Sequence, residues 1–141
     1  MYAIKRIALL FILLSPALAG AASGVTVQTE REMYEECSAF SQAGMRECLA
    51  KKAEDSQRTL RQAEKKVVSA LSKWDEYDIY IKESKAKFAA ANKEFIRYRK
   101  AQCAFGSSLS GGGAGSVREM GRLGCVAELR SEEHTSELQS R

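Results

Sequence analysis

Proline is almost absent from the sequence, and one long stretch lacks glycine as well. Among its 141 residues there is one proline, Pro16, and neither proline nor glycine occurs between Met45 and Cys103. A stretch of this length without a helix breaker permits very long helices. We therefore expect an all-α fold.

Histidine is almost missing, since His134 is the only one. It lies in Arg130–Ser140, which reads as the in-frame translation of a widely used sequencing-library adapter. We therefore expect residues 130–141 to be a non-native tail outside the fold; the alternative is a polar C-terminal helix capped by Ser131. Without this histidine there is no His base and no His ligand. Because a Cys-His pair and a recognisable carboxylate pair are lacking too, we expect no enzyme, no catalytic residue, no metal and no cofactor.

Long apolar runs are lacking after the first residues. Two basic residues precede the apolar run Ile7–Leu14, and Ala17–Ala19 has the small-x-small form that signal peptidase accepts. Eight apolar residues cross only about half of a roughly 30 Å hydrocarbon core. We therefore expect residues 1–19 to be a cleaved signal peptide rather than an uncleaved membrane anchor. The mature protein would begin near Gly20 and be periplasmic or secreted.

Residues 20–129 form one domain's length, with 18 lysines and arginines against 15 aspartates and glutamates, a net charge of +3. Glutamates crowd the segment Glu30–Glu36, whereas basic residues follow one side of a later helical pattern: Lys82, Lys85, Lys93, Arg97 and Lys100. This basic stripe is either a solvated helix face or a surface that attracts anionic lipid or acidic envelope polymer. Export argues against nucleic acid, and so do the aromatic residues, which we expect on the buried side.

Two apolar stripes with steps of three or four residues predict two long helices. The first begins after a Ser41 cap, with Gly44 where a capping box would have Glu or Gln. Its members are Met45, Leu49, Ala53, Ser56, Leu60, Ala63, Val67, Leu71 and Trp74. The second stripe comprises Tyr77, Ile81, Ser84, Phe88, Ala91, Phe95, Tyr98 and Gln102. We expect a turn at 75–78 and an antiparallel hairpin with the stripes facing each other; the alternative is one continuous rod.

After Cys103 the chain changes to a serine- and glycine-rich linker over residues 107–116. The linker lacks the lysine and following Ser or Thr of a phosphate-binding P-loop. Apolar residues then recur at short helical spacing from Val117 to Leu129, interrupted by two glycines. This pattern predicts a short third helix that folds back onto the hairpin.

Four cysteines in an exported chain predict two disulfides. We favour Cys37 with Cys48 and Cys103 with Cys125, which would tie each end segment to the nearer long helix. The alternative pairing joins Cys37 to Cys125 and Cys48 to Cys103. A zinc site is less well supported because neither pair has the usual two-to-four residue spacing.

Several short motifs together resemble the LprI-like lysozyme inhibitor domain of bacterial exported proteins, over about residues 34–129. They are Cys37, Ser41–Ala50 with Cys48, Phe95–Cys103, a glycine-rich loop, and Cys125–Leu129. Family members usually carry Glu at Gly44, Trp at Phe95, and acidic residues at Lys100 and Gln102. We expect structural roles for four residues of these motifs: Met45, Phe95, Tyr98 and Arg99.

The resemblance implies a helical periplasmic or surface protein whose activity in some members is inhibition of lysozyme. The best-known lysozymes are strongly basic, so a domain of charge +3 gains little steering toward them. Inhibition would then depend on local shape or on the acidic Glu30–Glu36 segment. The competing expectation is an envelope-binding module that uses the basic stripe and whose binding weakens with salt.

Overall fold

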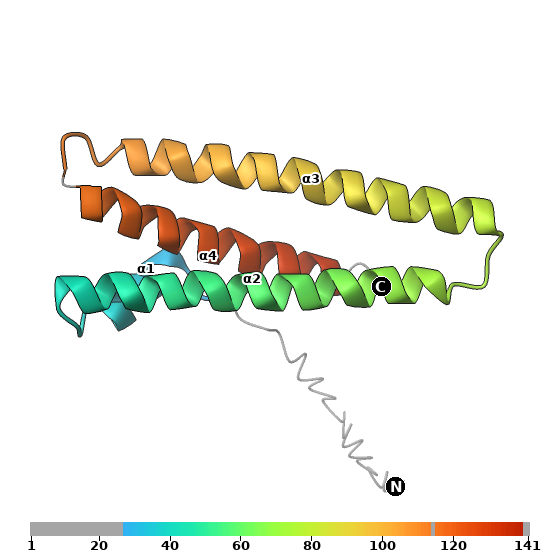
Figure 1. Cartoon of the computed structure of the whole chain (residues 1–141), viewed down its shortest axis with the longest axis horizontal. Coiled ribbons are helices and arrows are strands. Elements are labelled where there is room, and N and C mark those ends of the chain that lie inside the picture. Colours follow the sequence, from blue (N-terminus) through green and yellow to red (C-terminus); the bar gives the residue numbers. More distant parts are fainter. Residues whose placement is uncertain (1–26, 114, 140–141) are drawn as a thin grey trace, which may run out of the picture.

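The computed structural model describes residues 27–113 and 115–139. In this part of the chain all regular structure is helical, in four helices: α1 (Glu30–Cys37), α2 (Gln42–Ser72), α3 (Asp78–Ser108) and α4 (Gly115–Gln139). The long helices α2 and α3 run antiparallel, and α4 folds back along them and stops short of their connecting turn (Figure 1). None of these helices is long and apolar enough to cross a membrane. The expected signal peptide lies outside the described residues.

Side-chain caps at Thr29 and Ser41 define where the first two helices begin. Thr29 and Glu32 form a capping box at the start of α1, each side chain accepting a hydrogen bond from the other residue's backbone N–H. The Ser41 hydroxyl accepts a bond of 3.3 Å from the Gly44 N–H, so the expected cap of α2 is confirmed. Gly44 has a packing reason as well, since a Cβ there would lie 2.9 Å from the Cβ of Phe40.

The first predicted stripe forms the inner face of α2. Its middle members are buried: Leu49, Ala53, Ser56, Leu60 and Ala63. Leu49 and Ala53 meet α1 and α4 in one core cluster together with Met33, Cys37, Met120 and Ala127. The core therefore lies at the end of the molecule where the two disulfides are, and it thins out toward the α2–α3 turn.

The expected short third helix is wrong. Helix α4 has 25 residues and runs to Gln139, so residues 130–139 are part of the fold rather than a tail beyond it. It contacts α2 and α3 far more extensively than those two contact each other. The sequence pattern missed the last part of α4 because polar side chains occupy its inward positions. Arg130 donates a hydrogen bond of 2.9 Å to the Ala53 carbonyl, and Glu133 is buried, so these positions carry no hydrophobic signal.

The second predicted stripe is only partly correct, because α3 is rotated relative to it. Four members of the stripe are exposed: Tyr77, Ala91, Tyr98 and Gln102. The buried residues of α3 are Arg99 and Cys103. Cys103 is bonded to Cys125 of α4, and Arg99 forms an ion pair with Glu133 of α4; this side of α3 therefore faces inward. Hydrophobic periodicity alone could not show this.

Gly121 and Gly124 of α4 mark the place where α1 packs against this helix. A Cβ at Gly124 would lie 2.9 Å from Glu30 Cγ and 3.3 Å from Tyr34 Cε2, whereas at Gly121 the nearest atom, Tyr34 Oη, is 3.7 Å away. Gly124 therefore permits the close approach of α1 to α4, and the helix-weakening residue predicted from sequence has a packing function.

Replacing Gly124 by leucine is expected to lower the free energy of unfolding by about 1–3 kcal/mol, because α1 must move to admit the side chain. The matched variant Gly121→Ala meets only ordinary contacts and should be neutral, or more stable by up to about 1 kcal/mol. Denaturant unfolding of both variants measures this. Equal stability of Gly124→Leu and the unchanged chain would show that α1 does not depend on the close approach.

Candidate functional site

Two disulfides hold the end of the molecule where α2 begins and α3 ends. Cys37–Cys48 joins α1 to α2, and Cys103–Cys125 joins α3 to α4. This is the pairing favoured from the sequence. Because each bond joins neighbouring helices at the same end, the opposite end of the hairpin has no covalent restraint other than its turn.

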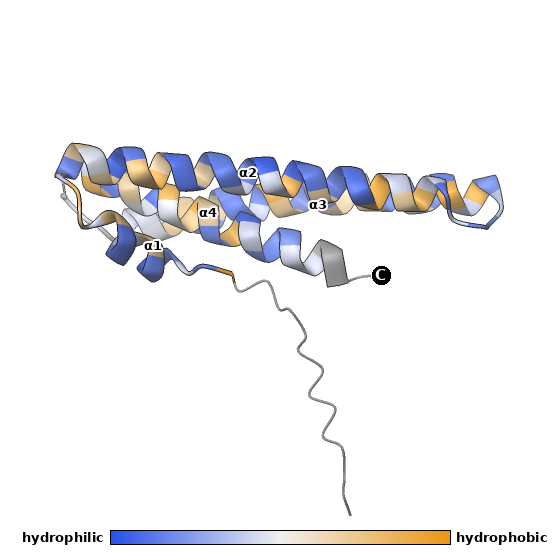
Figure 2. Cartoon of the chain, turned by 90° about the horizontal axis from the view of Figure 1, so that it is seen from below, coloured by the Kyte–Doolittle hydropathy of each residue, from blue (hydrophilic) through white to orange (hydrophobic). Residues whose placement is uncertain are grey.

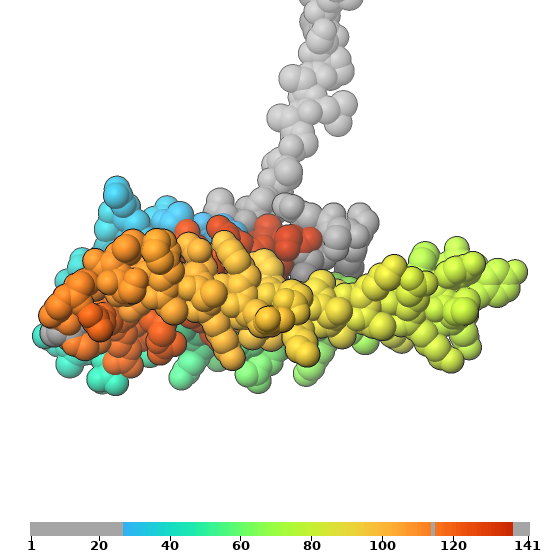
Figure 3. All heavy atoms as spheres, turned by 90° about the horizontal axis from the view of Figure 1, so that it is seen from above, coloured from blue at the N-terminus to red at the C-terminus, as the bar shows by residue number. Residues whose placement is uncertain are grey.

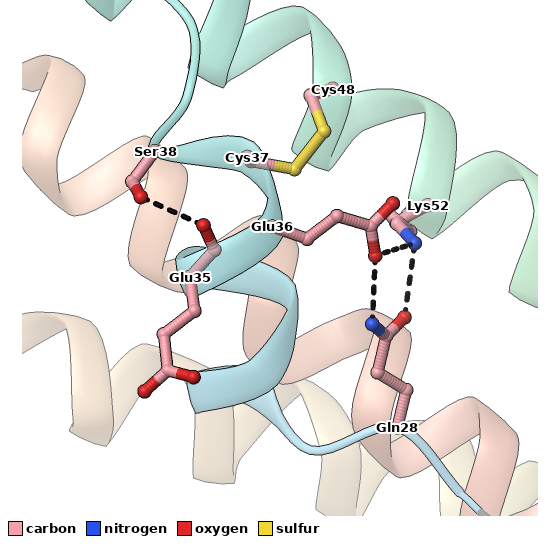
Figure 4. Close-up of a disulfide and its surroundings, with 7 residues drawn as sticks. All are labelled: Gln28, Glu35, Glu36, Cys37, Ser38, Cys48 and Lys52. Carbon is pink, nitrogen blue, oxygen red and sulfur yellow. Dashed lines mark hydrogen bonds and ion pairs between the residues drawn. A yellow bond between two sulfur atoms is a disulfide. The ribbon is translucent and has the colours of Figure 1, made fainter.

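A hydrogen-bond network lies beside the first disulfide (Figure 4). The ammonium of Lys52 donates 2.5 Å to Glu36 and 3.0 Å to the side-chain oxygen of Gln28, and the Gln28 amide donates 2.8 Å to the same Glu36 carboxylate. The bonds from Lys52 and then Gln28 hold the pKa of Glu36 below its ordinary value. The network fastens the segment before α1 to α2.

Because the pKa of Glu36 is lower folded than unfolded, its stabilising effect is present above the ordinary carboxylate range and is lost as pH falls through the lowered pKa. We expect Lys52→Met to return this pKa toward its ordinary value. An NMR titration of the Glu36 side chain measures the change, with Lys51→Met as the exposed neighbouring control. The assignment is contradicted if the titration of Glu36 is the same in Lys52→Met and in the unchanged protein.

Two of the four carboxylates of the acidic segment Glu30–Glu36 are engaged within the molecule. Glu32 closes the capping box, Glu36 is held by Lys52, and the backbone N–H of Glu30 donates 3.1 Å to Glu128 of α4. Burial and then the nearby Glu128 raise the pKa of Glu30. The segment is therefore in part a structural contact of α1, while the exposed Glu35 carboxylate is in no ion pair within the described residues.

The four motif residues fall in different environments. Met45 packs against the core cluster. Phe95 is half-buried and Tyr98 is 53% exposed, and the centroids of their rings are 5.8 Å apart. Arg99 is buried and donates 2.6 Å to Glu133 of α4. The structure therefore gives Met45 and Arg99 packing contacts but does not bring the four residues together into one site.

An open groove of about 600 Å³ runs between α2 and α3. Its apolar lining includes Val68, Phe88 and Ile96, and Asn92 donates 3.4 Å to Glu64 across it. Four members of the predicted basic stripe also line it: Lys85, Lys93, Arg97 and Lys100. Arg97 is paired with Glu94 at 3.1 Å, whereas none of these three lysines is in an ion pair within the described residues.

The second exposed feature is the turn between α2 and α3, here named the hairpin tip and defined as residues 73–80. Four of the eleven large apolar side chains exposed in the described part of the chain lie in it: Trp74, Tyr77, Ile79 and Tyr80. Three exposed carboxylates, those of Asp75, Glu76 and Asp78, lie among them. In Figure 2 the connecting turn is hydrophilic on the hydropathy scale used, and hydrophobic residues lie in the adjoining ends of α2 and α3.

Comparison with protein-family models identifies the chain. The model described as lysozyme inhibitor LprI matches residues 35–138, which include both disulfides and most of α4. The chain belongs to the LprI family. No curated protein and no solved structure matches it. An LprI protein is named for inhibition of lysozyme, a binding function, and the two disulfides fit an exported protein.

Sequence reasoning found the cysteines, the basic stripe and the turn of this LprI protein but missed the hairpin tip. Trp74 and Tyr77 continue the periodic stripes and were therefore expected to face inward. Their position could have indicated exposure. They flank a polar turn at the far end of two long helices, and a shorter third helix that packs on the other end does not cover that turn.

Proposed function

We propose that this LprI protein is exported and binds and inhibits lysozyme, as a binding protein rather than an enzyme. The observation that carries the proposal is the family match over residues 35–138. The architecture supports it, because a disulfide-held body that projects a narrow helical hairpin suits recognition of another protein better than it suits enclosing a substrate.

Export rests on two further features. Residues 1–19 have the composition of a signal peptide, and we propose cleavage near Gly20. Disulfides persist in oxidising compartments, which agrees with a periplasmic or secreted location. Mass spectrometry of protein recovered from the periplasm or culture medium tests the cleavage site.

Lysis of bacterial cell walls tests inhibition. Several lysozymes are titrated with oxidised protein beginning at Gly20, at low and at high salt. Saturable inhibition near a one-to-one ratio supports the proposal. Folded, oxidised protein that inhibits none of the lysozymes contradicts it. Protein reduced and alkylated at its four cysteines serves as the control for non-specific effects of a basic polypeptide.

The groove between α2 and α3 favours a second candidate function, binding to an anionic envelope surface. Its apolar lining and basic rim would hold a ligand that is anionic and partly apolar. Sedimentation with anionic and neutral vesicles tests this, with Lys85, Lys93 and Lys100 changed to glutamine. Binding that requires anionic lipid, weakens with salt and falls in the triple variant supports it.

We also propose that residues 130–141 do not belong to the natural protein, because they read as a translated library adapter. Their helical place in α4 does not bear on their origin, since a natural segment at this position would continue the same helix. Sequencing the gene from its source organism decides the question. A natural sequence that departs from this one after Leu129 supports the proposal, and an identical one contradicts it.

A further inference from the structure

The hairpin tip concentrates apolar surface that no part of the described chain covers. Trp74 is 46% exposed, Tyr77 78%, Ile79 69% and Tyr80 51%. Given the usual area of aromatic side chains, their exposed parts sum to on the order of 400 Å². This is about half of what each partner contributes to a stable protein complex, and it is comparable with the largest apolar patches of monomeric proteins, which are often functional.

The tip is ordered by its own backbone. The N–H groups of Lys73 and Trp74 donate to the last carbonyls of α2, Glu76 donates 3.0 Å to Trp74, and the carbonyl of Tyr77 accepts bonds from Tyr80 and Ile81 as α3 begins. The rings of Tyr77 and Tyr80 meet edge to face with centroids 6.4 Å apart. Apolar groups held in a short, hydrogen-bonded turn lose little freedom on binding, which favours affinity.

The shape of the tip is narrow and convex. Only the ends of α2 and α3 form it, because α4 stops short of it, and it projects beyond the body of the molecule (Figures 1 and 3). A projection two helices wide fits a cleft rather than a flat surface. Its exposed carboxylates add local negative charge to a chain that is positive overall.

We propose that the hairpin tip enters the substrate cleft of lysozyme. This inference rests on the proposed function and adds the surface that performs it. A cleft that binds polysaccharide accepts flat, partly polar groups, and Trp74, Tyr77 and Tyr80 supply aromatic rings with polar edges. Asp75, Glu76 and Asp78 complement the surface of a strongly basic lysozyme, which the overall charge of +3 does not.

The other charged surfaces fit this partner less well. In the acidic segment at α1, Lys52 pairs with the Glu36 carboxylate and the Glu32 carboxylate caps its own helix, so half of the segment's four carboxylates are engaged within the molecule. The groove between α2 and α3 is rimmed by lysines that would repel a basic enzyme. The tip combines exposed aromatic groups with carboxylates that are in no ion pair within the described residues.

Binding of the full chain to a strongly basic lysozyme, measured by calorimetry, tests the proposal. Trp74→Ala with Tyr77→Ala is expected to weaken binding at least tenfold, because aromatic residues of this kind dominate interface energies. Tyr98→Ala is the matched control, an aromatic residue of α3 that is 53% exposed and lies away from the tip; it should change affinity less than about twofold. Circular dichroism and thermal unfolding verify that each variant is folded.

Two further measurements separate the possible outcomes. A trimer of N-acetylglucosamine, which occupies the cleft, should compete with the protein for lysozyme. Asp75→Asn with Glu76→Gln should slow association at low salt about tenfold and leave dissociation nearly unchanged. Wild-type affinity in the Trp74 and Tyr77 double variant, or binding unaffected by the trimer, overturns the assignment of tip and cleft. Absence of binding by the unchanged protein overturns the proposed function itself.

Discussion

Replacing Arg99 by methionine is expected to lower the free energy of unfolding by about 3–5 kcal/mol, the usual effect of removing one partner of a buried ion pair. Arg99 is 6% exposed and Glu133 4% exposed, and the guanidinium donates 2.6 Å to the carboxylate. Without Arg99, the Glu133 carboxylate would stay buried among the helices without its cation. Glu133→Leu should have a similar effect, because it leaves the guanidinium without an acceptor.

The double variant Arg99→Met with Glu133→Leu should recover most of this loss, since apolar residues of similar volume replace a buried pair at little cost. Denaturant unfolding of the four proteins gives the coupling energy. In a chain that ends at Leu129, where α4 no longer covers Arg99, the methionine substitution should have little effect. Strictly additive single effects would contradict a functional ion pair.

The pair also predicts a pH dependence. Burial raises the pKa of Glu133 above its ordinary value, and the attraction of Arg99 only partly offsets this. A carboxyl group with a higher pKa folded than unfolded favours folding at low pH, and that contribution is lost as pH rises through the folded pKa. We therefore expect stability to fall more steeply with rising pH in Arg99→Met than in the unchanged chain, because Glu133 loses the cation that partly offsets its burial.

Removal of the Cys103–Cys125 disulfide is the second large effect. The bond closes a loop of 22 residues, so replacing both cysteines by alanine should cost about 3 kcal/mol. The loss of this bond should affect more than one helix. The glycine-rich loop would be the remaining covalent link between α3 and α4, and α4 packs against both long helices. We expect loss of α4 docking together with a lower stability of the whole hairpin.

The matched control removes Cys37–Cys48, which closes 11 residues and holds only α1. Its predicted entropic cost is smaller by about 0.6 kcal/mol, and hydrogen exchange should increase mainly in α1. Amide exchange and denaturant unfolding of both double variants measure the difference. Protection of α4 in the variant without Cys103 and Cys125 would contradict the assigned role of this bond.

The periodicity of hydrophobic residues predicted correctly those helix faces that are buried because their side chains are apolar. Leu49, Ala53 and Leu60 recur at steps of three and four and do face the core, so the inner side of α2 could be derived from sequence. The inward side of α3 depends instead on a cysteine and an arginine, whose partners lie on another helix. The inward positions in the last part of α4 carry Arg130 and Glu133, polar residues that give no apolar signal.

The candidate site was harder to predict for a related reason. Trp74 continues the apolar pattern of α2, so hydrophobic periodicity predicts that it is buried in a core. Helix α4 ends before this point and leaves Trp74 uncovered. Whether an apolar side chain is buried depends on the length of its neighbour as well as on its own helix. Exposure of the hairpin tip therefore required the three-dimensional arrangement.

The Cys103–Cys125 bond spans the glycine-rich loop, so the backbone can be cleaved in this loop without release of a fragment. A backbone cut between Ser110 and Gly113, where the chain is exposed, leaves α4 covalently attached to α3. The cut molecule would gain the mass of one water and separate into two fragments only after reduction. The same loop is therefore a suitable place to insert a label or a second domain while both termini remain free.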